Sequence, residues 1–259
     1  MDADGPDAFV ALAGRLADAA GEVIRPYFRT AISIDEKADA SPVTVADRES
    51  EAAMREILAA ECPDHGILGE EYGAERVDAD YVWVLDPIDG TKSFIAGVPL
   101  FGTLIALLYR GRPVVGIIDQ PVLGERWLGV DGQATRFNGG AAAVRPCAAL
   151  AEATLVTTSP DMFGGGDAEA FARLRGAAKS TRYGYDCYGY AMLGMGFIDL
   201  IIEADLAPYD YCALIPVIAG AGGIITDWAG EPLGLGSDGR ICAAGDARVH
   251  AQALDLLNP

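Results

Sequence analysis

The segment WVLDPIDGTKSF, residues 83–94, carries two aspartates at the point where an apolar run ends. The run at 81–85, YVWVL, predicts a buried strand, so Asp86 and Asp89 lie where that strand leaves the core. A carboxylate in this position needs a partner, because an unpaired charge is costly to remove from water. The segment therefore predicts a binding site at a strand end.

Three further acidic residues lie at the ends of predicted elements in distant parts of the chain. Glu70 comes directly after a short apolar stretch, Glu203 ends a predicted strand, and Asp210 opens a predicted helix. Carboxylates at rigid strand ends can converge on a hard divalent cation such as Mg²⁺, which binds several oxygen ligands. These residues together predict a metal centre.

The residues that follow Asp86 add groups that suit phosphate. Pro87 stiffens the turn and leaves the Ile88 carbonyl free to point inward as a further oxygen ligand. Gly90 and Thr91 supply backbone N–H groups at the start of a predicted helix, where such groups favour an anion. Metals beside an anion site indicate phosphate chemistry.

Length and composition fit one large domain or two closely packed ones. The chain has 259 residues, 51% of them hydrophobic, which is enough for a sizeable core. We expect antiparallel strands with helices at 1–145 and alternating helices and strands at 146–259. The predicted class is mixed α+β and α/β, with a boundary near residue 145.

Charge, cysteines and hydropathy restrict the partners and the compartment. A net charge of −19, with no basic cluster in the sequence, opposes binding to nucleic acid. Five widely spaced cysteines indicate reduced thiols and a cytoplasmic location rather than disulfides or a zinc site. The acidic N-terminal sequence and the lack of a long apolar run disfavour export and a membrane span.

Hydrophobic periodicity predicts the regular elements of both halves. The expected helices lie at 7–29, 44–60, 167–178, 185–195, 210–221 and 248–257. The expected strands lie at 81–85, 103–109, 114–118, 154–158, 197–203, 223–226 and 241–244. The sequence RGRP joins the second and third of these strands and predicts a hairpin.

Simpler interpretations exist for single residues. Asp47 fits a first-turn helix acid, and Asp186 or Asp210 fits a helix cap. His250 is expected to be exposed on the last helix. The sequence has only one other histidine, His65 in a predicted turn, and this disfavours a His-rich zinc centre and a Ser-His-Asp triad. Pro87 stands where phosphatases with the pattern D-x-D-G-T need a nucleophilic aspartate, so a phosphoaspartate is excluded there.

Three segments together resemble the hallmark segments of the inositol monophosphatase superfamily. They are GEE at 69–71, WVLDPIDGTKSF at 83–94 and PYDYCALIPVIAGAGG at 208–223, in the order and spacing of that superfamily. Its members are Mg²⁺-dependent phosphomonoesterases with a layered αβαβα fold. The stretch GYDCYGYAML at 184–193 adds a resemblance to the histidinol-phosphate phosphatase branch.

The resemblance implies a role for each matching residue. Two or three Mg²⁺ ions would be bound by Glu70, Asp86, the Ile88 carbonyl, Asp89 and Asp210. Asp47 and Thr91 would form a hydrogen-bonded pair beside the attacking water, with Glu70 next to it. Asp89 and the N–H groups of Gly90 and Thr91 would hold the phosphate. Attack on phosphorus would be in line and without a covalent intermediate.

The expected substrate is a small phosphorylated metabolite. The candidates for contacts beyond the metals are Glu203, Asp186 and Arg182. Two acids suit a substrate that carries an ammonium group, as histidinol phosphate does and inositol phosphate does not. This comparison favours conversion of histidinol phosphate to histidinol in histidine biosynthesis.

Other functions stay open on the residues alone. The chain could instead cleave inositol 1-phosphate or 3′-phosphoadenosine 5′-phosphate, or be a metal-binding regulatory protein without catalysis. The predicted pocket acids oppose a nucleotide, and a protein that only holds metals needs no pair such as Asp47 and Thr91. The resemblance also implies a homodimer, and Phe101 and Trp127 fit either its interface or the core.

Overall fold

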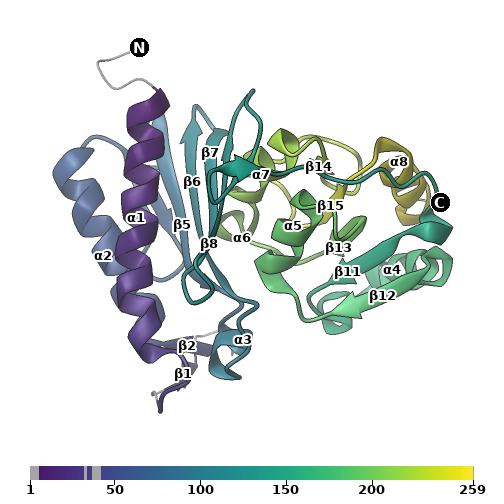
Figure 1. Ribbon diagram of the computed structural model, residues 1–259, viewed down its shortest axis with the longest axis horizontal. Helices are drawn as coiled ribbons and strands as arrows, with labels where there is room; N and C mark the ends of the chain where they lie inside the picture. The colour runs from purple at the N-terminus through teal and green to yellow at the C-terminus, as the bar shows by residue number, and fades with distance from the viewer. Residues whose placement is uncertain (1–5, 32–33, 37–41, 259) are drawn as a thin grey trace.

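The computed structural model describes residues 6–31, 34–36 and 42–258. Helices and sheets alternate in five layers, in the order helix, sheet, helix, sheet, helix (Figure 1). The predicted αβαβα class is therefore confirmed. Residues 1–5, on which the expectation about export partly depends, lie outside the described residues. Within those residues, no helix is both long and apolar enough to cross a lipid bilayer.

The first sheet has eight strands in the order β10-β9-β8-β7-β6-β5-β3-β4. Its strands are β3 Gly66–Gly69, β4 Gly73–Glu75, β5 Tyr81–Asp89, β6 Gly102–Tyr109, β7 Arg112–Gln120, β8 Glu125–Val130, β9 Arg136–Phe137 and β10 Gly140–Ala141. Neighbouring strands are antiparallel except for β3 and β5, which run parallel. Two short strands, β1 Ile34–Glu36 and β2 Pro42–Thr44, pair with each other outside this sheet.

Two amphipathic helices, α1 Pro6–Tyr27 and α2 Val45–Glu61, cover the outer face of the first sheet. α1 buries one stripe of apolar side chains against β6 and β7, at the four-residue spacing expected of a helix on a sheet. The helix α2 begins at Val45, and Thr44 caps it in a capping box. Thr44 Oγ1 accepts from the Ala46 N–H, and Asp47 Oδ2 accepts from the Thr44 N–H. This cap fixes the position of Asp47.

The second sheet has five strands in the order β12-β11-β13-β15-β14. They are β11 Thr154–Thr157, β12 Ser180–Tyr183, β13 Leu200–Glu203, β14 Ile224–Thr226 and β15 Ile241–Ala244. β11 runs parallel to β12 and β13, whereas β15 is antiparallel to β13 and β14. Two helices, α4 Gly165–Ala177 and α8 Ala247–Leu257, lie on its outer side (Figure 1).

Three short helices fill the layer between the sheets: α5 Asp186–Gly194, α6 Pro208–Tyr211 and α7 Leu214–Gly220. One hydrophobic cluster joins Val84 of the first sheet to Ile201 of the second through Tyr190 and Val217 of this layer. Along the chain, however, the strands of the first sheet end with β10 and those of the second sheet begin with β11. The division into domains 1–145 and 146–259 stays a prediction.

The long elements lie within a few residues of their predicted positions. The hairpin at RGRP is confirmed, because β6 and β7 are joined by Arg110 and Gly111, both with positive φ. The helix predicted at 210–221 is in fact two helices, α6 and α7. A short helix, α3 Thr91–Ile95, follows β5 at the position expected from the sequence.

Two predictions about exposure are resolved by the packing. The prediction of an exposed His250 is wrong, because the ring is buried and lies 2.9 Å from Thr226 Oγ1. His250 shares a helical stripe with Ala253 and Leu257, which α8 buries against the second sheet. Phe101 and Trp127 are fully buried, so core packing and not an interface accounts for both.

The helix α7 packs so closely on the first sheet that Gly129 has no room for a side chain. A Cβ there would lie 2.3 Å from the backbone of Pro216 and Val217. We expect Gly129→Ala to destabilise the protein by about 3 kcal/mol, because backbone atoms cannot move aside as a flexible side chain can. Urea unfolding measures this loss.

Gly140→Ala is the matched control, because its Cβ would meet no atom closer than 3.4 Å. We expect that variant to stay within about 0.5 kcal/mol of the wild type. Equal stability of the two variants would show that the contact between α7 and β8 is looser than described.

Candidate active site

Three carboxylates converge where β5 ends. Asp86, Asp89 and Asp210 each place an oxygen within 4.8 Å of the others. Residues three apart on a regular strand point to opposite faces, and the pairing of β5 with β6 shifts register between Asp86 and Asp89. This irregularity in the strand allows both side chains to reach the same site.

Backbone groups hold two of these carboxylates. The Ala207 N–H donates to Asp210 Oδ2 at 2.7 Å, so Asp210 caps α6 as well as facing the site. The Cys187 N–H, near the start of α5, donates to Asp89 Oδ2 at 2.5 Å. Asp86 Oδ1 is buried without a hydrogen-bond partner among the described residues. An acceptor in that state is available to a cation.

The electrostatics of the cluster favour a bound cation. Burial raises the pKa of Asp86 well above its ordinary value, and the nearby charges of Glu70, Asp89 and Asp210 raise it further. Burial and the charge of Asp186 do the same to the pKa of Asp89. Carboxylates that repel one another in this way either keep protons or bind cations, and an all-oxygen donor set suits a hard divalent ion. The residues present therefore fit such an ion.

Glu70 lies in the turn between β3 and β4 and faces the same cluster. Its side chain is half-buried, lines the pocket and raises the pKa of Asp86 through charge and hydrogen bonding. Its N–H donates to the Leu85 carbonyl of β5 at 3.1 Å. The predicted convergence of Glu70 with the three aspartates is thus present in the structure.

Asp47 and Thr91 form the predicted hydrogen-bonded pair. Thr91 Oγ1 lies 3.3 Å from Asp47 Oδ1 and 3.1 Å from the Ile88 carbonyl, so its proton can be donated to either oxygen. Asp47 is fully buried, which raises its pKa. Its other oxygen accepts from the N–H of Thr44 at 2.9 Å, so Asp47 is also the first-turn acid that the simpler interpretation proposes.

A pocket of about 260 Å³ opens beside this cluster. Seven of the predicted residues line it: Glu70, Asp89, Gly90, Thr91, Asp186, Glu203 and Asp210. Asp47, Asp86 and Ile88 are buried next to it. The structure does not bring Arg182 to this site, because Arg182 is exposed on β12 and is absent from the lining.

The two acids predicted for substrate contact differ in their surroundings. Glu203 is buried and accepts from the Thr158 N–H and hydroxyl and from the Tyr190 hydroxyl, at 2.6 to 2.9 Å. Asp186 begins α5 and accepts from the Ser93 hydroxyl at 2.6 Å. It is not the helix cap suggested by the simpler interpretation, because Asp186 is the first residue inside α5 and Tyr185 occupies the cap position.

The sequence analysis missed several lining residues: Lys92, Thr158, Met162, Cys187, Tyr190 and Leu206. Among the described lining residues, Lys92 is the only cationic one. Two of the missed residues could have been found from the sequence, because Lys92 follows Thr91 directly and Thr158 ends a predicted strand. The other four are apolar or aromatic residues that sequence patterns do not separate from the core.

Comparison with known proteins agrees with this geometry. The model of the inositol monophosphatase family matches residues 6–258. The chain belongs to the inositol monophosphatase family. This family member is 52% identical to the bifunctional phosphatase IMPL2, chloroplastic, of Arabidopsis thaliana, over 97% of this chain and 75% of that protein. It is 35% identical to a histidinol-phosphatase of Mycobacterium tuberculosis, over 97% of this chain and 98% of that protein.

A solved structure supports the same assignment. The inositol monophosphatase of Zymomonas mobilis superposes with a TM-score of 0.91 and 49% identity, and the match covers 98% of each chain. The inositol monophosphatase family member described here is therefore a phosphoric monoester hydrolase. Its relatives carry both histidinol and inositol names, so they leave the ester open.

The bound ions, the oligomeric state and the location of this family member stay predictions. The family is generally metal-dependent, but the identity and number of the ions stay predictions. A homodimer also stays a prediction. The plant relative is named chloroplastic, so the cytoplasmic location is a prediction as well.

Titration of Glu203 makes the metal-free protein less stable as the pH rises. Burial raises its pKa to about 7 from an ordinary 4.5, so the folded state holds this proton more tightly than the unfolded chain. The resulting stability is fully present below pH 4.5 and is lost as the pH rises to about 7. Relative to Glu203→Gln, we expect the wild type to lose about 3 kcal/mol across this window.

Urea unfolding in EDTA between pH 4 and pH 8 measures this difference. The glutamine variant keeps an acceptor for Thr158 and does not titrate, so the other acids cancel in the comparison. A difference between the two proteins that stays constant with pH would contradict the raised pKa of Glu203.

Proposed function

We propose that this phosphatase hydrolyses histidinol phosphate to histidinol with bound Mg²⁺. The observation that carries the proposal is the convergence of Asp86, Asp89 and Asp210 within 4.8 Å, beside a pocket that also holds Asp186 and Glu203. The first group suits cations and the phosphate they bind. The second group suits a positively charged substrate end.

The proposed metal ligands are Glu70, Asp86, the Ile88 carbonyl, Asp89 and Asp210. When bound, Mg²⁺ would neutralise the phosphoryl charge and lower the pKa of a water molecule. The Thr91 hydroxyl would orient that water, and Asp47 would accept a hydrogen bond from the hydroxyl and so hold it in place. The N–H groups of Gly90 and Thr91 would bind phosphoryl oxygens at the start of the short helix α3.

The substrate end of the pocket supports histidinol phosphate. Asp186 lines the pocket and would pair with the ammonium group of the substrate. Glu203, held by Thr158 and Tyr190, adds a second acid to the same region. Apart from its phosphate, inositol phosphate carries only hydroxyl groups, so it has no cation with which to form such an ion pair.

Inositol 1-phosphate is the second candidate. The solved structure from Zymomonas mobilis, at 49% identity, is of an inositol monophosphatase. Lys92 also lines the pocket and offers a hydroxyl group or the phosphate a donor. A comparison of kcat/KM for the two esters decides between them, and a large preference for the inositol ester would overturn the proposed substrate.

Asp86→Asn tests the metal site. We expect kcat to fall by at least about 1000-fold, or about 4 kcal/mol, because a buried charged ligand becomes neutral while the side-chain shape is kept. We also expect weaker Mg²⁺ binding by calorimetry and an intact fold. Phosphate release against Mg²⁺ concentration gives the rate.

The control is Asp205→Asn, since Asp205 is exposed and its φ of 61° is one that asparagine adopts readily. We expect this variant to keep its rate within about twofold of the wild type. Full Mg²⁺-dependent turnover by Asp86→Asn would eliminate the proposed metal assignment.

Asp186→Asn tests the substrate end. We expect kcat/KM for histidinol phosphate to fall about tenfold, as loss of one partly exposed charge-assisted hydrogen bond implies. For inositol 1-phosphate we expect a change below about twofold. An equal loss for both esters would assign Asp186 to the general structure of the pocket, not to recognition of the ammonium group.

A further inference from the structure

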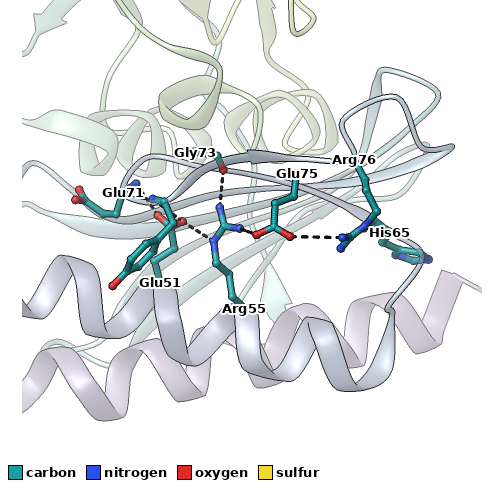
Figure 2. Close-up of polar contacts among 8 residues, drawn as sticks. Glu51, Arg55, His65, Glu71, Gly73, Glu75 and Arg76 are labelled. Carbon is teal, nitrogen blue, oxygen red and sulfur yellow. Dashed lines mark hydrogen bonds and ion pairs between the residues drawn. The ribbon is translucent and has the colours of Figure 1, made fainter.

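Glu51 is a fully buried acid outside the pocket lining. It lies in α2, and its carboxylate accepts from the N–H of Glu71 at 2.8 Å and of Tyr72 at 3.2 Å. Arg55, one turn later in α2, donates from Nε to Glu51 Oε1 at 2.8 Å. Figure 2 shows the Glu51 carboxylate between the helix and the turn that follows β3.

The turn that Glu51 holds is the one that carries Glu70. The Glu70 N–H bonds to Leu85 of β5, and the next two N–H groups along the chain bond to Glu51. The backbone is therefore fixed at Glu70 and directly after it. The following strand, β4, is an exposed edge strand, so the sheet supports this turn from one side only.

Arg55 extends the same contacts along the hairpin that β3 and β4 form. It donates to the Gly73 carbonyl at 2.5 Å and pairs with Glu75 at 2.8 Å. Glu75 contacts Arg76 at 3.5 Å, and Arg76 donates to the His65 carbonyl at 3.0 Å. This row of polar contacts runs from the Glu70 turn to the base of the hairpin (Figure 2).

The approach of Glu51 leaves no space for a side chain at Gly69. A Cβ at that position would lie 1.9 Å from Glu51 Oε1. Glycine directly before Glu70 thus lets the buried carboxylate reach the N–H groups of the turn. In the sequence GEE, the glycine therefore makes room for Glu51, and the first glutamate is Glu70.

We propose that Glu51, supported by Arg55, is a positioning residue that holds Glu70 in place for a divalent cation. The inference rests on the proposed role of Glu70 as a metal ligand. Ordering a loose turn at the moment of binding would cost conformational entropy, and a buried carboxylate that fixes the backbone beforehand avoids that cost.

Glu51→Gln tests the proposal, because the amide cannot accept from all three donors and turns an NH₂ group toward one of them. We expect Mg²⁺ alone to bind about tenfold more weakly by calorimetry. We also expect faster hydrogen exchange at the Glu71 and Tyr72 amides in the metal-free protein, beyond what any loss of global stability explains. The exchange measurement does not depend on activity.

Asp199→Asn is the matched control. Asp199 is a buried acid of the other half, and it accepts from Arg145 and from the Thr154 N–H. We expect this variant to lose stability while its Mg²⁺ affinity and the exchange at the Glu71 amide stay unchanged. Equal effects of the two substitutions on Mg²⁺ affinity, or no effect of Glu51→Gln, would overturn the positioning role.

Arg55→Gln gives a second test if Glu51→Gln does not fold. We expect a smaller loss of Mg²⁺ affinity, because the Glu51 carboxylate keeps its bonds to the turn, and an unchanged affinity would overturn the proposal. Mg²⁺ binding by the wild type distinguishes failure of the proposed function from failure of the positioning role. If it binds no Mg²⁺, the proposed function fails; if it binds Mg²⁺ as tightly as Glu51→Gln does, only the positioning role fails.

Discussion

Repulsion among buried carboxylates is the constraint on which the centre of this molecule depends. Asp86, Asp89 and Asp210 lie within 4.8 Å of one another, and burial raises the pKa of each. Such a cluster opposes folding unless protons or cations neutralise it. The hydrophobic packing of two sheets and three helical layers therefore has to hold the acids together, and a cation that relieves the repulsion also stabilises the fold.

The geometry of the cluster is set by backbone as much as by side chains. An irregularity in β5 allows Asp86 and Asp89 to reach one site, and N–H groups of α5 and of the turn before α6 hold Asp89 and Asp210. The carboxylates thus come from two local structures, the end of β5 and the first turn of α6, and backbone hydrogen bonds stabilise both. A site prepared in this way needs little reorganisation when a ligand binds.

The sequence predicts the parts of the structure that depend on local pattern. Asp86 and Asp89 follow a long apolar strand, so their position is readable without tertiary information. The strands β4, β9 and β10, at the two ends of the first sheet, are only two or three residues long and show little apolar alternation. Pairing with neighbouring strands, and not their own residue pattern, defines them. Single-residue patterns cannot reveal such strands.

Contacts between distant segments explain where the structure departs from the sequence predictions. Glu51 meets the turn after Glu70 across twenty residues, as its bond to the Glu71 N–H shows, and no periodicity marks that meeting. His250 looks polar in sequence, yet the stripe it shares with Ala253 faces the core. Arg182 lies near Asp186 in sequence but is exposed on β12, since a glycine turn separates the strand from α5.

The pocket is assembled from two separate stretches of the chain. Glu70, Asp89 and Thr91 belong to the first half, whereas Thr158, Asp186 and Glu203 belong to the second. Amino-acid changes at Thr158, Asp186 or Glu203 can therefore alter which ester is selected without replacing a proposed metal ligand, although one such ligand, Asp210, also lies in the second half. Divergence of this kind is consistent with relatives that share one architecture and carry histidinol and inositol names.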